Sequence, residues 1–157
     1  MQNEIIDNWL EPFLSQYLKE HFKYKIPHWW GHVSDPQETN MMYNCDLNPN
    51  DTMNAYLFNR LCFSLNKKLK LIRMYLNIQH PGMDGVFHTD DGTITCVYMV
   101  TDTLKNSGYF EIKGEKKIQF IHNRLIAFDA KKWHKGHAPK KDIRITLAFK
   151  CREEIYE

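Results

Sequence analysis

Three residues of the chain have the types and spacing of a metal-binding set. His88 and Asp90 form an H-x-D pair, and His134 lies further along the chain. Side chains two positions apart on an extended strand point to the same face, so we expect the pair to lie on a strand and to reach one ion together. About one H-x-[DE] pair is expected by chance in a chain of this composition, so the pair alone carries little weight.

The order of the residues strengthens this interpretation, because Arg144 and Thr146 follow His134 in an Arg-Ile-Thr segment. Two histidines and one carboxylate on one triangular face of an octahedral ion leave three positions open. This arrangement suits non-heme Fe(II) and dioxygen chemistry, with a bidentate keto acid and O₂ in the open positions.

The stretch from about Leu69 to Lys150 resembles the 2-oxoglutarate and Fe(II)-dependent oxygenase superfamily. The order H-x-D, distant H and R-x-[ST] is matched by His88, Asp90, His134, Arg144 and Thr146. Phe128-Asp129 before the distal histidine, Gly136 after it and Thr95-Cys96-Val97-Tyr98 after the pair resemble the small prolyl-hydroxylase-like members of bacteria and phages.

The resemblance implies a mainly β fold, the double-stranded β-helix or jelly roll, and a catalytic centre in which His88, Asp90 and His134 hold Fe(II). Arg144, helped by the Thr146 hydroxyl, would bind the distal carboxylate of the cosubstrate 2-oxoglutarate. Decarboxylation of 2-oxoglutarate to succinate and CO₂ would be coupled to hydroxylation of a C–H bond with O₂. Ascorbate is a further candidate cofactor.

Two polar positions before the H-x-D pair, Asn77 and Gln79, correspond to places where related enzymes have polar cosubstrate contacts. Gln79 stands where a tyrosine is common in those enzymes, so the chain departs from their pattern at this position. Tyr75 is a rival candidate for the same role, although a strand tyrosine often only packs.

His137 competes with His134 for the place of the third ligand, and we predict His134. The interval of ten residues from His134 to Arg144 agrees with the order of the family, whereas His137 would leave seven. Gly136 would also leave space for the keto acid beside the metal.

The substrate is open at this point. A peptidyl proline or other amino-acid side chain, or a small molecule, is favoured by the resemblance. A methylated nucleobase, and hence a nucleic-acid partner, is supported only by the lysines between Lys131 and Lys141. A non-catalytic cupin-type metal-binding protein and a zinc hydrolase are alternatives of another class, but neither needs a buried arginine after its last ligand.

Other candidate residues have simpler interpretations. We expect the pair Trp29 and Trp30 to belong to the core, with contact to a substrate as the alternative. The five remaining histidines are expected to be surface or structural residues, and they are His21, His28, His32, His80 and His122.

The elements that must position these residues follow from hydrophobic spacing. Apolar residues at helical intervals predict helices over 4–22 and 51–66, and the segment 24–46 between them is expected to form irregular strands or loops. Short strands are predicted over 69–79, 93–101, 108–112, 117–121, 123–128 and 143–150. Positions 73–79 and 143–149 alternate between polar and apolar residues, which fits a barrel with its polar face turned inward and both N-terminal helices packed on its outer face.

Composition bounds the remaining questions. With 157 residues, we expect a single domain over 1–157, with a helical and irregular support (1–68) and a jelly-roll core (69–150). The net charge of +2 is too small to indicate nucleic-acid binding by itself. The four cysteines are scattered, which indicates reduced thiols in the cytoplasm, and neither a signal peptide nor a membrane partner is expected.

Overall fold

The fold is described by a computed structural model that covers residues 2–34, 36–37, 40–103 and 107–154. Its elements, in chain order, are β1 (Glu4–Ile6), α1 (Pro12–Tyr24), β2 (Trp29–Val33), β3 (Met41–Asp46), α2 (Thr52–Leu65), β4 (Leu69–Gln79), β5 (Ile94–Met99), β6 (Tyr109–Ile112), β7 (Ile118–Gln119), β8 (Leu125–Asp129), β9 (His134–Gly136) and β10 (Arg144–Glu153). The prediction of a mainly β chain is confirmed.

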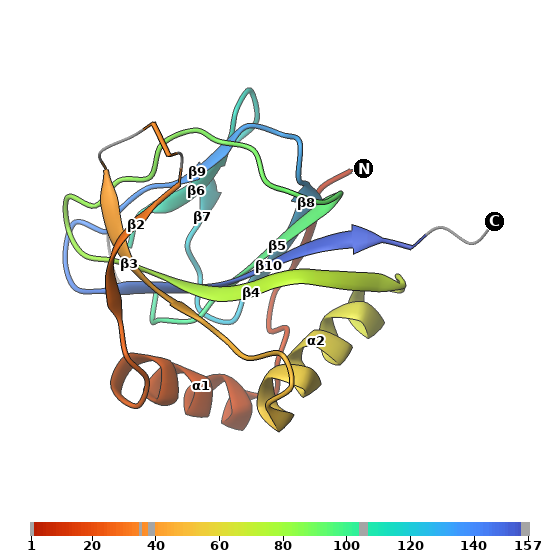
Figure 1. The fold of residues 1–157 in the computed structure, drawn as a ribbon. Coiled ribbons are helices and arrows are strands. Elements are labelled where there is room, and N and C mark those ends of the chain that lie inside the picture. The colour runs from red at the N-terminus through yellow and green to blue at the C-terminus, as the bar shows by residue number, and fades with distance from the viewer. Residues whose placement is uncertain (1, 35, 38–39, 104–106, 155–157) are drawn as a thin grey trace.

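The strands form two antiparallel sheets, as expected for a jelly roll (Figure 1). Within the described ranges the larger sheet has seven strands in the order β1-β8-β5-β10-β4-β3-β2, and the smaller has three in the order β7-β6-β9. Both helices lie on one side of β3 and β4, and the smaller sheet lies on the other side (Figure 1). The larger sheet is thus covered on both faces.

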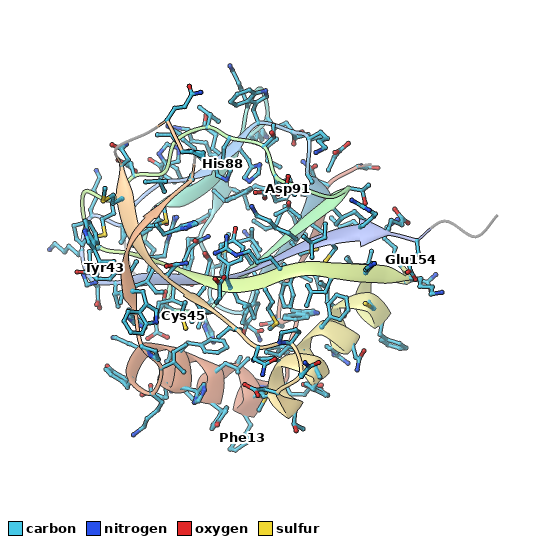
Figure 2. The ribbon with its side chains drawn as sticks, in the orientation of Figure 1. Phe13, Tyr43, Cys45, His88, Asp91 and Glu154 are labelled. Atoms are coloured by element: carbon cyan, nitrogen blue, oxygen red, sulfur yellow. The ribbon has the colours of Figure 1, made fainter. Side chains whose placement is uncertain are left out.

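The two faces of β4 and β10 contact different surroundings. Their apolar side chains join one core cluster with residues of both helices, and its members include Leu18, Phe22, Leu57, Leu61, Leu76, Ile78, Ile145, Leu147 and Phe149. The alternate positions face the smaller sheet instead. Figure 2 places His88 and Asp91 on this second side, while Phe13 on α1 points away from the sheet.

The predicted helix over 4–22 is wrong at its N-terminal end. Residues Glu4–Ile6 form β1, which pairs with β8 at the edge of the larger sheet. The chain then turns through Asn8, whose φ is 53°, and α1 begins at Pro12. Proline lacks the N–H that an interior helix position must donate, so it belongs in the first turn of a helix.

The segment 24–46, predicted to form irregular strands or loops, contains β2 and β3, which extend the larger sheet beyond β4. The prediction that Trp29 and Trp30 belong to the core is wrong, since their side chains are 65% and 57% exposed on β2. β2 is the last strand of the larger sheet, and the aromatic composition alone does not reveal this position.

None of the described helices is long and apolar enough to cross a membrane. The four cysteines, all within the described ranges, are free thiols.

Candidate metal centre and adjoining cavity

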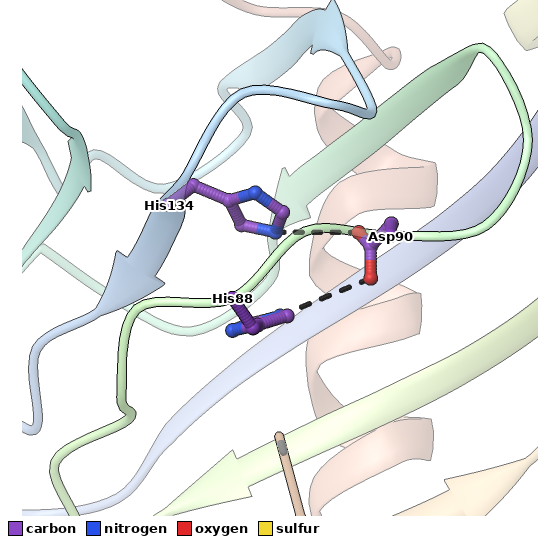
Figure 3. A group of neighbouring side chains, drawn as sticks. All are labelled: His88, Asp90 and His134. Carbon is purple, nitrogen blue, oxygen red and sulfur yellow. Dashed lines mark ion pairs between the residues drawn. The ribbon is translucent and has the colours of Figure 1, made fainter.

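His88, Asp90 and His134 lie together, as the sequence pattern predicts. Each can offer one ligand atom, and the three atoms lie within 4.8 Å of one another. His134 Nε2 is 3.2 Å from Asp90 Oδ2 and His88 Nε2 is 3.8 Å from Asp90 Oδ1 (Figure 3). No other such group of three or more histidine, cysteine or acidic side chains occurs in the described part of the chain.

The backbone brings the two histidines together in a different way from the expected strand. His88 and Asp90 follow β4 in a loop, and His88 makes an isolated bridge to His134 on β9. The backbone N–H of each histidine donates to the carbonyl of the other, over 3.1 and 2.9 Å. His88 therefore owes its position to β9, and the Asp90 N–H donates to Ala130 O, just after β8, so the H-x-D pair has no strand of its own.

Hydrogen bonds to the backbone fix which ring nitrogen of each histidine is available. His88 Nδ1 lies 2.9 Å from Val86 O, and His134 Nδ1 lies 2.9 Å from Lys132 O. Because a carbonyl only accepts, each Nδ1 carries the proton and each Nε2 keeps a lone pair. Both lone pairs are on the nitrogens nearest Asp90.

Asp90 is buried among groups that keep it ionised. Thr95 Oγ1 donates to Asp90 Oδ2 over 2.8 Å, and Lys150 Nζ lies 2.8 Å from Asp90 Oδ1. Burial alone would raise the pKa of Asp90, but contacts with His134 and Lys150 together lower it well below its usual range. Burial lowers the pKa of His88, and the neighbouring His134 lowers it further. A carboxylate beside neutral imidazole is the protonation state that metal binding requires.

A cavity of about 450 Å³ adjoins these residues and is lined by the inward positions of β4 and β10. The two strands pair in register, so four cross-strand pairs follow one another along the cavity, and they are Arg144 with Gln79, Thr146 with Asn77, Ala148 with Tyr75 and Lys150 with Arg73. All eight residues predicted for the metal and the cosubstrate line this cavity.

Arg144 occupies one end of the cavity and is 3% exposed. Its guanidinium donates to Tyr109 O and to Gln79 Oε1, while Arg144 Nε has no hydrogen-bond partner among the described residues. Burial lowers the pKa of Arg144 to about 9. No carboxylate of the described residues lies within ion-pair distance of Arg144, so this cationic end of the cavity fits an anionic ligand.

Gly136 lies against the guanidinium rather than only beside the metal set. A Cβ atom at position 136 would lie 2.5 Å from Arg144 Nη2 and 3.3 Å from Gln79 Oε1. The H-x-G spacing therefore leaves room for Arg144 as well as for a ligand.

The three candidate cosubstrate contacts on β4 differ in their surroundings. Gln79 Nε2 donates to Met83 O over 2.8 Å and its oxygen accepts from Arg144, so its amide is already engaged. Asn77 Oδ1 is buried without a partner in the described structure. Tyr75 is 5% exposed and packs under the guanidinium of Arg73, 4.1 Å from its ring centre.

His137 lies in a second cavity, of about 410 Å³, lined also by Asp84 and Tyr109. His137 Nε2 is 2.5 Å from Glu111 Oε2, and the ring stacks edge-on against Tyr109. His134, which belongs to the metal set, instead packs edge-on against Phe128, with ring centres 4.7 Å apart.

Three polar residues that were not predicted for the site also line the main cavity, and they are His32, Thr95 and Lys150. Arg73 lines it too, as the alternation over 73–79 predicted. Lys150 continues the even positions of β10 that hold Arg144 and Thr146, so the same alternation could have identified it. His32 was expected on the surface, and only the pairing of β2 with β3 brings it to the cavity.

The donor set fits a divalent metal ion. Two imidazole nitrogens with lone pairs and one ionised carboxylate converge, and the adjoining cavity leaves room for further ligands. The unpartnered Nε of buried Arg144 fits a dicarboxylate that reaches from the metal to the end of the cavity.

Comparison with known proteins identifies the fold. No family model matches the chain, and no curated protein matches it. Among solved structures, a viral collagen prolyl hydroxylase from Paramecium bursaria Chlorella virus-1, in complex with 2-oxoglutarate, aligns with a TM-score of 0.74 and 15% identity, over 99% of this chain and 97% of that chain.

Two prolyl hydroxylases of other organisms are similarly close. The Trichoplax adhaerens enzyme, in complex with a peptide fragment of hypoxia-inducible factor, has a TM-score of 0.76 and 14% identity, over 96% of this chain and 83% of that one. The Pseudomonas putida prolyl-4-hydroxylase has a TM-score of 0.74 and 12% identity, over 96% and 92%. The resemblance read from the sequence motifs is confirmed at the level of structure: the chain has the fold of the 2-oxoglutarate and Fe(II)-dependent oxygenases, including small viral and bacterial prolyl hydroxylases.

Proposed function

We propose that the chain is a 2-oxoglutarate- and Fe(II)-dependent dioxygenase that hydroxylates a C–H bond. One observation carries the proposal: a single cavity contains both the His88, Asp90 and His134 set and a buried arginine with no carboxylate partner in the described structure. A metal with open positions and a cation at a fixed distance from it together select a keto acid with a second carboxylate.

His88, Asp90 and His134 are the residues that would hold Fe(II). When bound, Fe(II) supplies the chemistry that couples two reactions of O₂: one oxygen atom enters succinate as 2-oxoglutarate loses CO₂, and the other is inserted into a C–H bond of the substrate. The protein contributes placement. Thr95 fixes the Asp90 carboxylate, and the carbonyls of Val86 and Lys132 fix the two rings.

Arg144 is the residue that would bind the distal carboxylate of 2-oxoglutarate, with the Thr146 hydroxyl beside it on the same face of β10. Asn77, directly opposite Thr146, has a side-chain amide that can turn its NH₂ toward the same ligand. We assign Gln79 to holding the Arg144 guanidinium, because its amide already contacts Arg144 and Met83. Tyr75 stays a candidate contact on the metal side of Asn77.

A peptidyl proline or another amino-acid side chain is the substrate we favour. Two of the similar structures are a collagen prolyl hydroxylase and a prolyl hydroxylase in complex with a peptide, which supports this choice. A nucleobase substrate has less support. Lys131 Nζ donates to Asp90 O and Lys132 Nζ to Glu115 Oε1, so two lysines of the basic segment are engaged within the protein.

The zinc hydrolase and the cupin-type storage protein do not account for Arg144. Burying a guanidinium without a counter-charge costs several kcal/mol, which neither function repays. A dicarboxylate cosubstrate supplies that counter-charge. Ascorbate, as an accessory reductant, stays a candidate of this proposal.

The test is binding of 2-oxoglutarate to Fe(II)-loaded protein without oxygen. We expect a weak visible metal-to-ligand charge-transfer band, which His88→Ala or Asp90→Ala abolishes. The absence of the band from folded, iron-loaded protein would refute the proposal. Zn(II) loading serves as the control, because zinc gives no such band.

A further inference from the structure

The end of the cavity opposite Arg144 is also cationic. Lys150 and Arg73 form the last of the four cross-strand pairs, six residues along β10 from Arg144. At about 3.4 Å per residue, the two ends of the row are roughly 20 Å apart. Asp90 lies against Lys150, so the metal set adjoins the Lys150 end, whereas Gly136, two residues after His134, lies against Arg144. A cosubstrate held by Arg144 leaves the Lys150 end to something else.

Lys150 is a largely buried cation at this end. Its side chain is 17% exposed, and its Nζ lies 2.8 Å from Asp90 Oδ1 and 5.7 Å from the Tyr75 ring centre. Asp90 is the one acidic group within ion-pair distance of Lys150 in the described structure. A divalent ion held by Asp90 draws on the same carboxylate charge, and a buried ammonium then needs a further anion.

The groups around Lys150 do not provide that anion. Arg73 lies directly opposite on β4, and its Nε is paired with Asp46 Oδ1 at 2.7 Å. His32 lines the same end, but an imidazole ring carries no negative charge; burial and the nearby cations Arg73 and Lys150 lower its pKa. Asp91 also lines the cavity, but it is exposed and makes no ion pair with Lys150.

We propose that Lys150, with Arg73 beside it, binds a carboxylate of the hydroxylated substrate close to the reacting C–H bond. This rests on the proposed function and narrows its substrate to an amino acid or peptide that carries a carboxylate at that point. Tyr75 forms the wall between the two cations, 4.1 Å from the Arg73 guanidinium, and provides an apolar surface for the substrate's carbon atoms.

The competing explanation is that Lys150 only orients Asp90. The two explanations predict different losses. A positioning residue, when removed, weakens metal binding whatever the substrate. If Lys150 contacts the substrate, its removal abolishes the preference for a substrate that carries a carboxylate. Metal binding does not weaken in that case, because the variant lacks a cation that repels the metal ion.

The test measures equilibrium binding by calorimetry to anaerobic protein loaded with Fe(II) and 2-oxoglutarate. The probes are matched pairs of N-acetyl-amino acids and their amides, for proline, leucine and arginine. N-acetyl-aspartyl and N-acetyl-glutamyl amides, which have a carboxylate only in the side chain, distinguish an acidic peptide from a free terminal carboxylate. We expect at least one carboxylate-bearing probe to bind about tenfold or more tightly than its uncharged partner.

Lys150→Met is expected to remove this preference, and Lys150→Arg to keep much of it. Lys131→Met is the matched control. Lys131 Nζ also contacts Asp90, by donating to the Asp90 backbone carbonyl, but Lys131 does not line the cavity. The inference would be overturned if both members of every probe pair bound equally, or if no probe bound at all. It would also be overturned if Lys150→Met bound Fe(II) more weakly but kept the preference for carboxylate-bearing probes. Failure to bind Fe(II) or 2-oxoglutarate would instead refute the proposed function, so the two failures are distinct.

Discussion

Arg144 on β10 lies directly opposite Gln79 on β4, and its guanidinium donates a hydrogen bond to the Gln79 amide oxygen. The same amide donates to Met83 O and Gly136 O, over 2.8 and 3.2 Å. One side chain therefore links the cation at the end of the cavity to the loop that leads to His88 and to the strand that carries His134.

Gln79→Leu tests this link. We expect 2-oxoglutarate to bind about tenfold more weakly, because Arg144 loses a partner that holds its guanidinium, while Fe(II) binding is retained. Stability should fall by about 1 to 3 kcal/mol, since buried polar groups lose their partners. Calorimetry and denaturant titration measure the two effects, with Gln119→Leu, an exposed strand position, as control. Unchanged 2-oxoglutarate affinity would show that Gln79 does not position Arg144.

Arg144→Ala should abolish most 2-oxoglutarate binding. Removing one partner of a desolvated charge pair costs about 2 to 5 kcal/mol, and Fe(II) binding should survive because Arg144 is not a ligand. Arg152→Ala, on the exposed part of the same strand, is the control. If Arg144→Ala develops the charge-transfer band at the same 2-oxoglutarate concentration as the wild type, Arg144 does not bind the distal carboxylate of 2-oxoglutarate.

Separate alanine variants of His134 and His137 test the choice of third ligand. His134→Ala should lose Fe(II), because it removes a donor of the metal set, whereas His137→Ala should retain it, since His137 contacts Glu111 in the second cavity. Metal content after dialysis provides the measurement. Loss of iron from the second variant alone would reverse the assignment.

His32 gives the metal-free protein a pH dependence of stability. Burial, with Arg73 and Lys150 nearby, lowers the pKa of His32 below its ordinary value of 6.5, so the unfolded chain binds the proton more readily. Stability from this group is complete above about pH 6.5 and is lost as the pH falls toward the lowered folded-state pKa. His88 acts in the same direction.

Denaturant titrations of metal-free protein between pH 7.5 and about pH 5 should therefore show falling stability, and His32→Gln should make the fall shallower. Asp90 does not contribute to the change in stability between pH 7.5 and about pH 5. Its pKa is lowered in the folded protein, so its carboxylate stays ionised in both the folded and the unfolded chain over this range. An identical slope in wild type and His32→Gln would contradict the prediction.

Asn123 stabilises the turn between β1 and α1. Its side chain accepts from Leu10 N and donates to Leu10 O, over 3.0 and 2.8 Å, and it also accepts from Tyr98 Oη. Asn123→Gly, which tolerates the left-handed φ of 63°, should lose about 2 to 4 kcal/mol because these buried groups lose their partners. Asn66→Gly, at the exposed end of α2 with φ 49°, should be nearly neutral. Similar losses in both variants would assign the effect to the backbone.

The sequence by itself determined most strands from Leu69 onward and which residues of β4 and β10 face inward. The alternation over Arg73, Tyr75, Asn77 and Gln79 predicted which side chains of β4 line the cavity, because the period of a strand is independent of what packs against it. The predicted limits 69–79 match β4, and the predicted helix 51–66 contains α2. Local spacing decides such features.

Only the tertiary structure decided what depends on partners distant in sequence. Glu4–Ile6 has helical spacing but becomes a strand because β8 offers an unpaired edge. His88 and Asp90 occupy a loop because the backbones of His134 and Ala130 hold them there. His32 reaches the cavity, and Trp29 stays exposed, because β2 is the last strand of the sheet. These contacts are stabilised by pairing between segments that are distant in sequence, and a local sequence pattern carries no information about such pairing.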